Sequence, residues 1–202
     1  MRQALTKSRN MVSIRLLRDI GRKFARDHAG KFGFDTDKLP KDLTLALGSV
    51  AVTPLELAEA YTVFANGGYK VEPYYINRIE ASDSAVLFLE NPVRVCDEAC
   101  MQLSLEVSLH DEELSELGLT EPGEMIDAEI LVAPRVIPES NSYQMDSMLK
   151  DVIQYGTARR AKVLNRTDIA GKTGTTNEQK DAWFAGYHPT AVTIVWVGFD
   201  DH

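Results

Sequence analysis

A lysine stands among glycines and small hydroxyl residues in the segment IAGKTGTTNEQKDAWFAGY, residues 169–187. Glycine weakens strands and short hydroxyl side chains add little to a core, so something other than packing selects this sequence. In a strand, Thr173 and Thr175 share one face, where their hydroxyls can donate to a carboxylate, and Lys172 supplies a compact cation from the other face. An exposed strand edge can also pair with a bound peptide. The pattern predicts a site for the anionic end of a peptide, although an ordinary surface strand remains the alternative for the tripeptide Lys-Thr-Gly by itself.

A second polar triad, Ser8-Arg9-Asn10, lies upstream of this lysine. Serine β-lactamases and penicillin-binding proteins combine Lys-Thr-Gly with a Ser-x-Asn type triad and a Ser-x-x-Lys motif. The order of the first two elements fits here. Taken alone, an asparagine at the start of a helix is usually only a cap, so the triad gains weight from its surroundings.

The apolar pattern predicts the helices and strands around these residues. Residues 11–20 predict a helix that Gly21 ends. In TPLELAEAYTVFANGG, residues 53–68, a capping threonine, a first-turn proline and a glutamate three residues after the threonine predict a second helix. The segments 69–80 and 85–90 predict a hairpin, with Pro73 placing its first strand at an edge.

The C-terminal third predicts the remainder of the sheet and the helix that supports it. A helical stripe of apolar residues ends at Gly156, and residues 167–176, 181–188 and 190–200 then predict an antiparallel meander of three strands. On its second strand, Trp183 and Tyr187 are expected in the core more than in a cleft. Asp181 is expected in a turn, with bracing of a nearby cation as the alternative.

Four long stretches carry a family resemblance: ALTKSRNMVSIRLLRDIG, LALGSVAVTPLELAEAYTVFANGGY, VIQYGTARRA and the lysine segment itself. Together they resemble the transpeptidase domain of class A penicillin-binding proteins, closest to the type 1a branch of Gram-negative bacteria. The resemblance covers the chain except the divergent residues 91–135. It implies an α+β fold of the penicilloyl-serine transferase, β-lactamase-like type. There, an antiparallel sheet is flanked by helices, and the active site lies between the lysine strand and a helical region. That fold is expected to be incomplete in this chain.

The resemblance also implies roles for the matching residues. Ser8 would relay a proton, Asn10 would hydrogen-bond the substrate amide, and Lys172 would organise the site electrostatically. Thr173, Gly174 and Thr175 would bind substrate: the two threonines would hold a carboxylate, and the Thr175 N–H would contribute to an oxyanion hole. The implied substrate is the D-Ala-D-Ala end of a peptidoglycan stem peptide, which β-lactams mimic. No cofactor and no metal are implied.

The nucleophile is the element that does not fit. The family attacks its substrate with the serine of Ser-x-x-Lys, which should precede Ser8, whereas the match here is Ser147-Met148-Leu149-Lys150. A helix would place the Ser147 hydroxyl and the Lys150 ammonium on one face, as base-assisted attack requires. The position of Ser147 after Ser8 in the chain argues against Ser147 as the nucleophile. We therefore expect residues 1–202 to be the C-terminal part of one transpeptidase domain, inactive by itself. A non-catalytic D-Ala-D-Ala or β-lactam sensing module of the same fold is the alternative.

Composition sets the remaining bounds. The chain has 202 residues and a net charge of −8, and residues 91–135 hold eleven Asp and Glu against two Arg. This stretch is predicted to be an acidic insertion, with partner docking as a further hypothesis. Such a balance disfavours nucleic acid as a partner. Cys96 and Cys100 are predicted to close a disulfide in an oxidising compartment or to be free thiols in the cytosol. The sequence has no apolar run that would span a membrane. The resemblance places the whole protein, with a membrane anchor and an upstream glycosyltransferase, at the periplasmic face of the inner membrane.

Overall fold

The computed structural model describes residues 1–96, 131–176 and 180–199. The chain divides into two compact units, Met1–Lys70 with Arg135–His202, and Val71–Pro134. The second unit thus begins twenty residues before the predicted acidic insertion at 91–135, most of which lies outside the described residues. Each unit is considered by itself.

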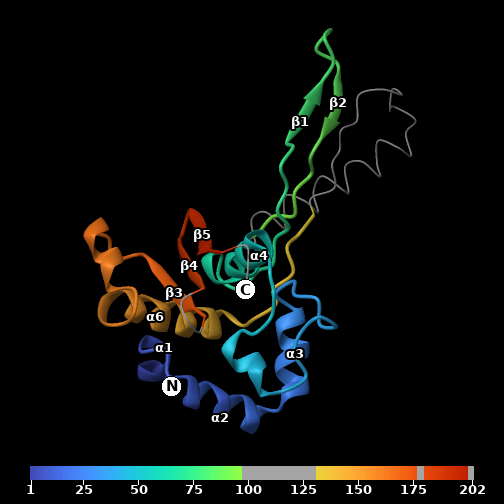
Figure 1. The fold of residues 1–202 in the computed structure, drawn as a ribbon. Helices are drawn as coiled ribbons and strands as arrows, with labels where there is room; N and C mark the ends of the chain where they lie inside the picture. Colours follow the sequence, from blue (N-terminus) through green and yellow to red (C-terminus); the bar gives the residue numbers. More distant parts are fainter. Residues whose placement is uncertain (97–130, 177–179, 200–202) are drawn as a thin grey trace. The chain divides into compact units, whose positions relative to one another are not determined.

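The first unit contains a three-stranded antiparallel sheet in the order β3-β4-β5, made of β3 (Ala170–Thr175), β4 (Asp181–His188) and β5 (Ala191–Gly198) (Figure 1). The predicted meander is therefore confirmed. Lys172 pairs with Ala185, and Thr173 pairs with Phe184. Among the described strands, β3 has β4 as its neighbour on one side and lies at the margin of the sheet.

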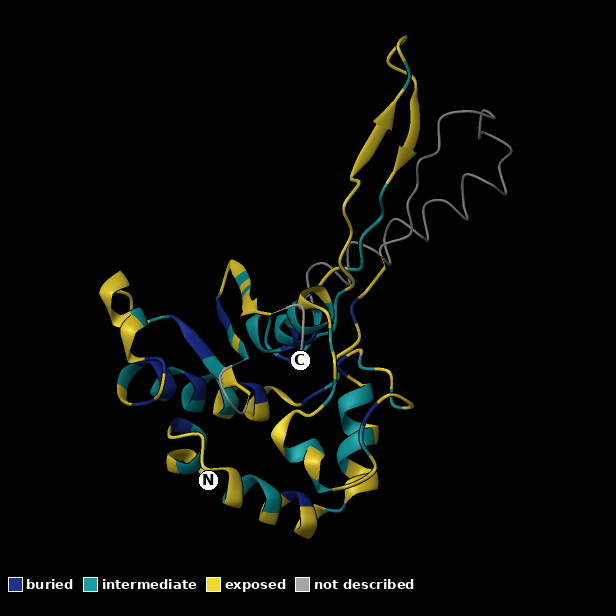
Figure 2. Cartoon of the chain, viewed as in Figure 1, coloured by how far each residue is buried: buried dark blue, intermediate teal, exposed yellow. Residues whose placement is uncertain are grey.

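Two helices cover this sheet: α4 (Pro54–Ala65) contacts β4 and β5, and α6 (Glu139–Tyr155) contacts β3. Val152 and Ile153 of α6 are fully buried and pack with Ile169 just before β3. A neighbouring cluster joins Leu149 of α6 to Ala170 and Tyr187 of the sheet. Figure 2 shows the buried colour concentrated where these helices meet the strands. Helices on an antiparallel sheet confirm the predicted α+β class.

The N-terminal helices form the helical part of the first unit. They are α1 (Arg2–Thr6), α2 (Asn10–Ile20) and α3 (Arg22–Gly30), followed by the 3₁₀ turn η1 (Leu43–Leu47). Gly21 separates α2 from α3 at a φ of 91°, a conformation that favours glycine. The predicted helix over 11–20 is confirmed, whereas α1 and α3 were not predicted. A second 3₁₀ segment, η2 (Arg159–Leu164), links α6 to β3.

Helix α4 begins as its sequence predicts. The Thr53 hydroxyl accepts a hydrogen bond from the Glu56 N–H at 3.1 Å, and the Thr53 N–H donates to the Glu56 carboxylate at 2.7 Å. This reciprocal capping box, with Pro54 in the first turn, fixes the N-terminal end of the helix. A well-defined start sets which face of α4 meets the sheet.

The second unit contains the hairpin of β1 (Arg78–Glu80) and β2 (Val86–Leu89), which pair antiparallel. The hairpin is confirmed, but its first strand is shorter than predicted, since residues 71–77 lie outside it. This segment contains Pro73, which has no N–H to donate to a strand ladder. Every residue of both strands is exposed, as the yellow ribbon in Figure 2 shows. The pairing shifts register between Ile79 and Glu80, which leaves Leu87 without a partner in the ladder.

Cys96 belongs to this unit and is disulfide-bonded. The prediction of a disulfide at Cys96 is therefore confirmed, and Cys100 lies outside the described residues. None of the helices within the described ranges combines the length and apolar character that crossing a bilayer requires.

Candidate functional site

Lys172 and Ser8 meet. The Lys172 Nζ donates to the Ser8 Oγ at 3.0 Å, although the two residues are 164 positions apart in the chain. The same ammonium donates to the carbonyl oxygen of Thr173 at 2.6 Å. The Ser-x-Asn triad and the lysine strand, which the family resemblance assigns to one active site, are thus in contact through Ser8 and Lys172. Their roles in catalysis remain predictions.

Ser8 is held by the way α1 ends. Its φ is 51°, in the left-handed region that non-glycine residues rarely adopt. The Arg9 N–H donates to the Ala4 carbonyl at 2.8 Å and the Ser8 N–H to the Leu5 carbonyl at 3.1 Å. These are the two bonds of a Schellman motif, with a serine at the position usually taken by glycine. The backbone of Ser8 is therefore fixed, and its hydroxyl projects from a defined place.

Helix α1 is in turn tied to α6. Arg2 donates to the Asp151 carboxylate at 2.8 Å, and the Lys7 Nζ donates to the Tyr155 carbonyl at 2.6 Å. The Thr157 N–H donates to the Thr6 carbonyl at 3.3 Å. Gly156 makes this approach possible, because a Cβ there would clash with that same carbonyl oxygen. Since α6 also packs on β3, one helix sets the positions of both Ser8 and Lys172.

The electrostatics of Lys172 follow from its half-buried position. Burial lowers the pKa of the Lys172 ammonium below its ordinary value, because a charged group loses hydration there. The two acceptors that it contacts, a hydroxyl and a carbonyl, are neutral oxygens. The charge is thus solvated by dipoles, and an anionic ligand beside β3 would gain from it.

The edge of β3 presents backbone groups as well as side chains. The Thr176 N–H donates to the Asp181 carbonyl at 3.0 Å, which fixes the phase of the antiparallel ladder. Because hydrogen-bonded pairs alternate along such a ladder, the N–H and C=O groups of Thr173 and Thr175 point away from β4. The bond from Lys172 to the Thr173 carbonyl agrees with this direction. A peptide laid along this margin could pair with the outward N–H and C=O groups of β3.

Three threonine hydroxyls lie by this edge. The Thr173 Oγ1 is 2.6 Å from the Thr157 Oγ1, which stands just after α6. Thr175 is exposed near the end of β3. The sequence predicted Thr173 and Thr175 as a carboxylate site but assigned nothing to Thr157. The sequence feature that could have indicated Thr157 is the Gly-Thr pair at the end of α6, inside the stretch VIQYGTARRA that resembles the family.

Two glycines of β3, Gly171 and Gly174, allow close approach of the neighbouring strand. A Cβ at Gly171 would lie 2.8 Å from the Ala185 carbonyl oxygen, and one at Gly174 would lie 3.3 Å from the Trp183 Cβ. Both distances are shorter than ordinary van der Waals contact. At these two positions the closely approaching groups belong to β4.

Asn10 opens α2 and is exposed two residues after Ser8. The residue in the capping position is Arg9, which makes no side-chain capping bond. The interpretation of Asn10 as an ordinary helix cap is therefore wrong. The side chain of Asn10 is therefore not the capping group of α2, and it lies two residues after Ser8.

Ser147 and Lys150 do not form the pair that a nucleophile and its base require. The Ser147 Oγ accepts from Arg2 at 3.0 Å, and the Lys150 Nζ pairs with Asp146 at 2.7 Å. Each group is engaged with a different partner. Ser147 instead contributes to the attachment of α1.

The other singled-out residues are structural. Tyr187 is buried, as predicted, and its hydroxyl donates to Asp146 at 3.2 Å. Burial, assisted by that carboxylate, raises the pKa of the Tyr187 hydroxyl. Asp181 is not in a turn but starts β4, where it accepts from the Trp196 indole at 2.9 Å. Trp183 is half-buried, its ring 6.0 Å from that of Trp196. Among the described residues, no group of three or more His, Cys, Asp and Glu is arranged to hold a metal ion.

The sequence model of the penicillin binding protein transpeptidase domain matches residues 1–201. The chain belongs to this family. Its relatives include penicillin-binding protein 1A of Pseudomonas aeruginosa, 49% identical over 99% of this chain and 26% of that protein, and penicillin-binding protein 1A of Vibrio cholerae, 39% identical over 100% of this chain and 24% of that protein. The chain thus spans about a quarter of the length of the curated relatives it matches.

Solved structures agree with the sequence relatives. The crystal structure of penicillin-binding protein 1A from Haemophilus influenzae superposes with a TM-score of 0.79 at 36% identity, over 99% of this chain and 30% of that one. PonA1 from Mycobacterium tuberculosis matches at a TM-score of 0.68 and 20% identity, which shows the fold alone. The predicted membership in the type 1a branch and the predicted transpeptidase fold are confirmed.

Proposed function

We propose that this chain forms the substrate-binding part of a serine D,D-transpeptidase, which cross-links peptidoglycan stem peptides and is acylated by β-lactams. The observation that carries the proposal is the 3.0 Å hydrogen bond between Lys172 and Ser8 beside the open margin of β3. It joins a cation, a hydroxyl and a free strand edge, which are the features that a peptide carboxyl terminus requires. Family membership and the relatives named above support the reaction class.

In this proposal the ligand lies along β3. The hydroxyls of Thr173 and Thr175 donate to its terminal carboxylate, with Lys172 as the nearby cation. Gly174, which lies between the two threonines, lets β3 pack closely on Trp183. Asn10 bonds the substrate amide. The outward Thr175 N–H donates to the carbonyl oxygen that becomes negative during attack, a contribution of roughly 3 to 4 kcal/mol for such a donor.

The Ser8 hydroxyl relays the proton. Its oxygen accepts a hydrogen bond from Lys172, so its own hydrogen is directed to the leaving amine nitrogen. In the acylation step a serine oxygen bonds to the carbonyl carbon, the C–N bond breaks, and the proton lost by the serine is delivered to the amine through Ser8. A second stem-peptide amine then displaces the serine and completes the cross-link.

The attacking serine is proposed to lie outside residues 1–202. The engagement of Ser147 with Arg2 and of Lys150 with Asp146 supports this, since neither is available to the other. On this proposal, residues 1–202 are the C-terminal part of a transpeptidase domain and residues 91–135 are an insertion within it. The isolated chain is then inactive, and the intact protein, with a membrane anchor and an upstream glycosyltransferase, works at the periplasmic face of the inner membrane.

A fluorescent penicillin tests the proposal on the intact protein. Lys172→Met and Ser8→Gly should each lower the acylation rate constant by roughly 10²- to 10³-fold, because each removes one member of the proton-handling pair. Lys41→Met is the matched control, an exposed lysine before η1 whose loss should leave the rate unchanged. Wild-type acylation by Lys172→Met would refute the assignment.

Two further outcomes separate the alternatives. Stable acylation without cross-linked product from lipid-linked substrate would favour a sensing module over an enzyme. Loss of labelling in Ser147→Ala, with retention of the fold, would make Ser147 the nucleophile and overturn the proposal of an external one.

The lowered pKa of Lys172 predicts the alkaline limit of activity. Because the protonated amine is the active form, acylation should fall as pH rises through a value below the ordinary lysine pKa of about 10.4. Lys172→Arg should move this limit to higher pH, since a guanidinium stays charged. Folding stability changes with pH in the opposite direction. The unfolded chain keeps the Lys172 proton to a higher pH than the folded chain does. The free energy of unfolding therefore increases as pH rises from the folded pKa of Lys172 to its unfolded pKa. A pH–rate profile that is identical in both proteins would exclude Lys172 as its origin.

A further inference from the structure

We infer that Thr157 is a positioning residue for the carboxylate site, acting through the hydroxyl of Thr173. The inference rests on the proposed function, because it assigns Thr157 to the same site. Its basis is the contact between the two hydroxyl oxygens, 2.6 Å apart, which joins the end of α6 to the middle of β3.

The direction of this hydrogen bond follows from the ligand. By geometry, either of the two oxygens can be the donor. A hydroxyl has one hydrogen, and an ionised carboxylate only accepts, so Thr173 must give its hydrogen to the ligand when one is bound. Thr157 must then be the donor in the pair. Its hydrogen bond holds the Thr173 oxygen in place and polarises the Thr173 O–H toward the carboxylate.

The backbone around Thr157 is well fixed. The Thr157 N–H donates to the Thr6 carbonyl at 3.3 Å, and the Ala158 N–H donates to the Val152 carbonyl at 3.2 Å. Gly156 and Ala158 on either side are buried. The Thr157 side chain is exposed, so its hydroxyl projects from an anchored turn toward the face where a ligand would lie.

Thr157 also connects the two halves of the site. Its N–H holds the end of α1 two residues before Ser8, and its hydroxyl holds the residue after Lys172. A single residue thus links the hydroxyl that relays a proton to the hydroxyl that binds the carboxylate.

The test compares Thr157→Val, which removes the hydroxyl at nearly constant shape, with Thr157→Ser, which retains it. In the intact protein, Thr157→Val should slow acylation by benzylpenicillin about five- to tenfold, as expected for the loss of one hydrogen bond. Thr157→Ser should restore the rate. The methyl ester of benzylpenicillin lacks the carboxylate, so its rate should be the same in all three proteins.

A merely structural role would give a different result. If Thr157→Val slowed the acid and the ester equally, or left both unchanged, the inference would be overturned. Adding Thr157→Val to Thr173→Val should cause no further loss with benzylpenicillin, because Thr157 acts only through Thr173. A full additional loss would instead mean that Thr157 contacts the ligand itself.

Failure of the proposed function would be seen separately, as absence of wild-type acylation. The inference can then still be judged by equilibrium binding of a D-Ala-D-Ala peptide and of its C-terminal amide. Thr157→Val should weaken binding of the free acid five- to tenfold and leave the amide unaffected. Equal binding of the acid by wild type and variant would overturn it.

Discussion

The two antiparallel regions of the chain differ in what surrounds their strands. The strands β3, β4 and β5 are covered by α4 and α6, and Ala170, Ala185 and Tyr187 are buried within them. In the strands β1 and β2 every residue is exposed, including Leu87 at 68%. Pairing of strands is common to both regions. What distinguishes the first is packing, and packing is what can hold a lysine and a serine at a fixed distance.

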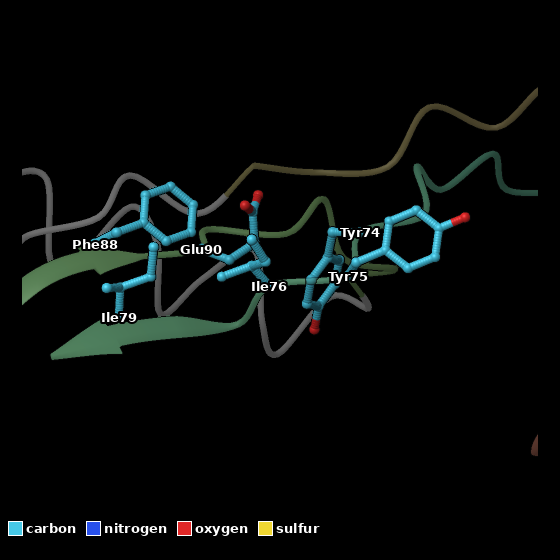
Figure 3. Close-up of a pocket in the computed structure, with 6 residues that line it drawn as sticks. All are labelled: Tyr74, Tyr75, Ile76, Ile79, Phe88 and Glu90. Carbon is cyan, nitrogen blue, oxygen red and sulfur yellow. The ribbon is translucent and has the colours of Figure 1, made fainter.

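The hairpin unit does have a hollow. Figure 3 shows Ile79 and Phe88 side by side on the paired strands, with Tyr74, Tyr75 and Ile76 on the segment before β1 and Glu90 just after β2. These six residues line a hollow of about 320 Å³. It is an open apolar surface, in contrast to the hydrogen-bonded polar site at β3.

The largest difference should come from truncating one apolar side chain in each region. Ile153→Ala should lower the unfolding free energy of the β3–β5 sheet by about 2 to 5 kcal/mol, because Ile153 is 0% exposed and its loss leaves a cavity. Leu87→Ala should change the stability of either region by less than about 0.5 kcal/mol. Native-state hydrogen exchange of the intact protein, read peptide by peptide, measures both. Equal effects would mean that the hairpin is packed against a partner in solution.

A glycine in the sheet should show the next largest effect. Gly171→Ala should destabilise the sheet by about 1 to 3 kcal/mol, since the new Cβ would lie 2.8 Å from the Ala185 carbonyl oxygen and force the strands apart. Gly174→Ala is the matched control, with 3.3 Å to the Trp183 Cβ and a correspondingly smaller cost. Hydrogen exchange of β3 and β4 peptides provides the measurement. A reversed order of the two variants would show that the strands adjust more easily than the side chain does.

Tyrosine hydroxyls should distinguish the two regions by a smaller amount. Tyr187→Phe removes a bond to Asp146 from a side chain that is 5% exposed, and should cost about 0.5 to 1.5 kcal/mol. Tyr75→Phe in the second unit alters a side chain that is 83% exposed and should cost nothing measurable. Exchange rates in α6 and β4 report the first effect. A neutral Tyr187→Phe would mean that Lys150 alone satisfies Asp146.

The sequence predicted the parts of this fold whose signals are local. The capping box of Thr53 and Glu56, the stop at Gly156 and the meander follow from residue types at short spacing. The meeting of Ser8 with Lys172 could be predicted only through the family motifs, because periodicity cannot bring together residues 164 positions apart. Helix α1 was missed because its five residues have too few apolar positions for a periodic signal.

The remaining misses depend on tertiary contacts. Asp181 was expected in a turn, but its carboxylate accepts a hydrogen bond from the indole of Trp196, which lies on the next strand, β5. This contact keeps Asp181 in the sheet. Thr157 received no role because the significance of its hydroxyl depends on Thr173 being 2.6 Å away. The left-handed Ser8 was equally unpredictable, since that position of a Schellman motif usually signals itself by a glycine.

The smallest predicted effect on stability compares two left-handed serines, one in each region. Ser8 has a φ of 51° and Ser84, in the hairpin turn, a φ of 68°. Glycine adopts this conformation without steric cost, so Ser8→Gly and Ser84→Gly should each leave local stability unchanged or raise it by up to about 1 kcal/mol. Ser8→Ala should be less stable than Ser8→Gly by a similar amount. Hydrogen exchange of α1 and of the hairpin gives these differences.

The variants Ser8→Gly and Ser84→Gly also distinguish the effect of backbone conformation from the effect of losing a hydroxyl in the site. Both glycine variants keep the turn, but only Ser8→Gly removes a hydroxyl that contacts Lys172. Acylation should therefore collapse in Ser8→Gly and persist in Ser84→Gly, at equal or better stability of both. If Ser8→Gly retained wild-type acylation, the serine at this position would serve only to end α1, and the contact with Lys172 would be structural. A loss in Ser84→Gly would instead mean that the hairpin, despite its exposed strands, takes part in recognising the ligand.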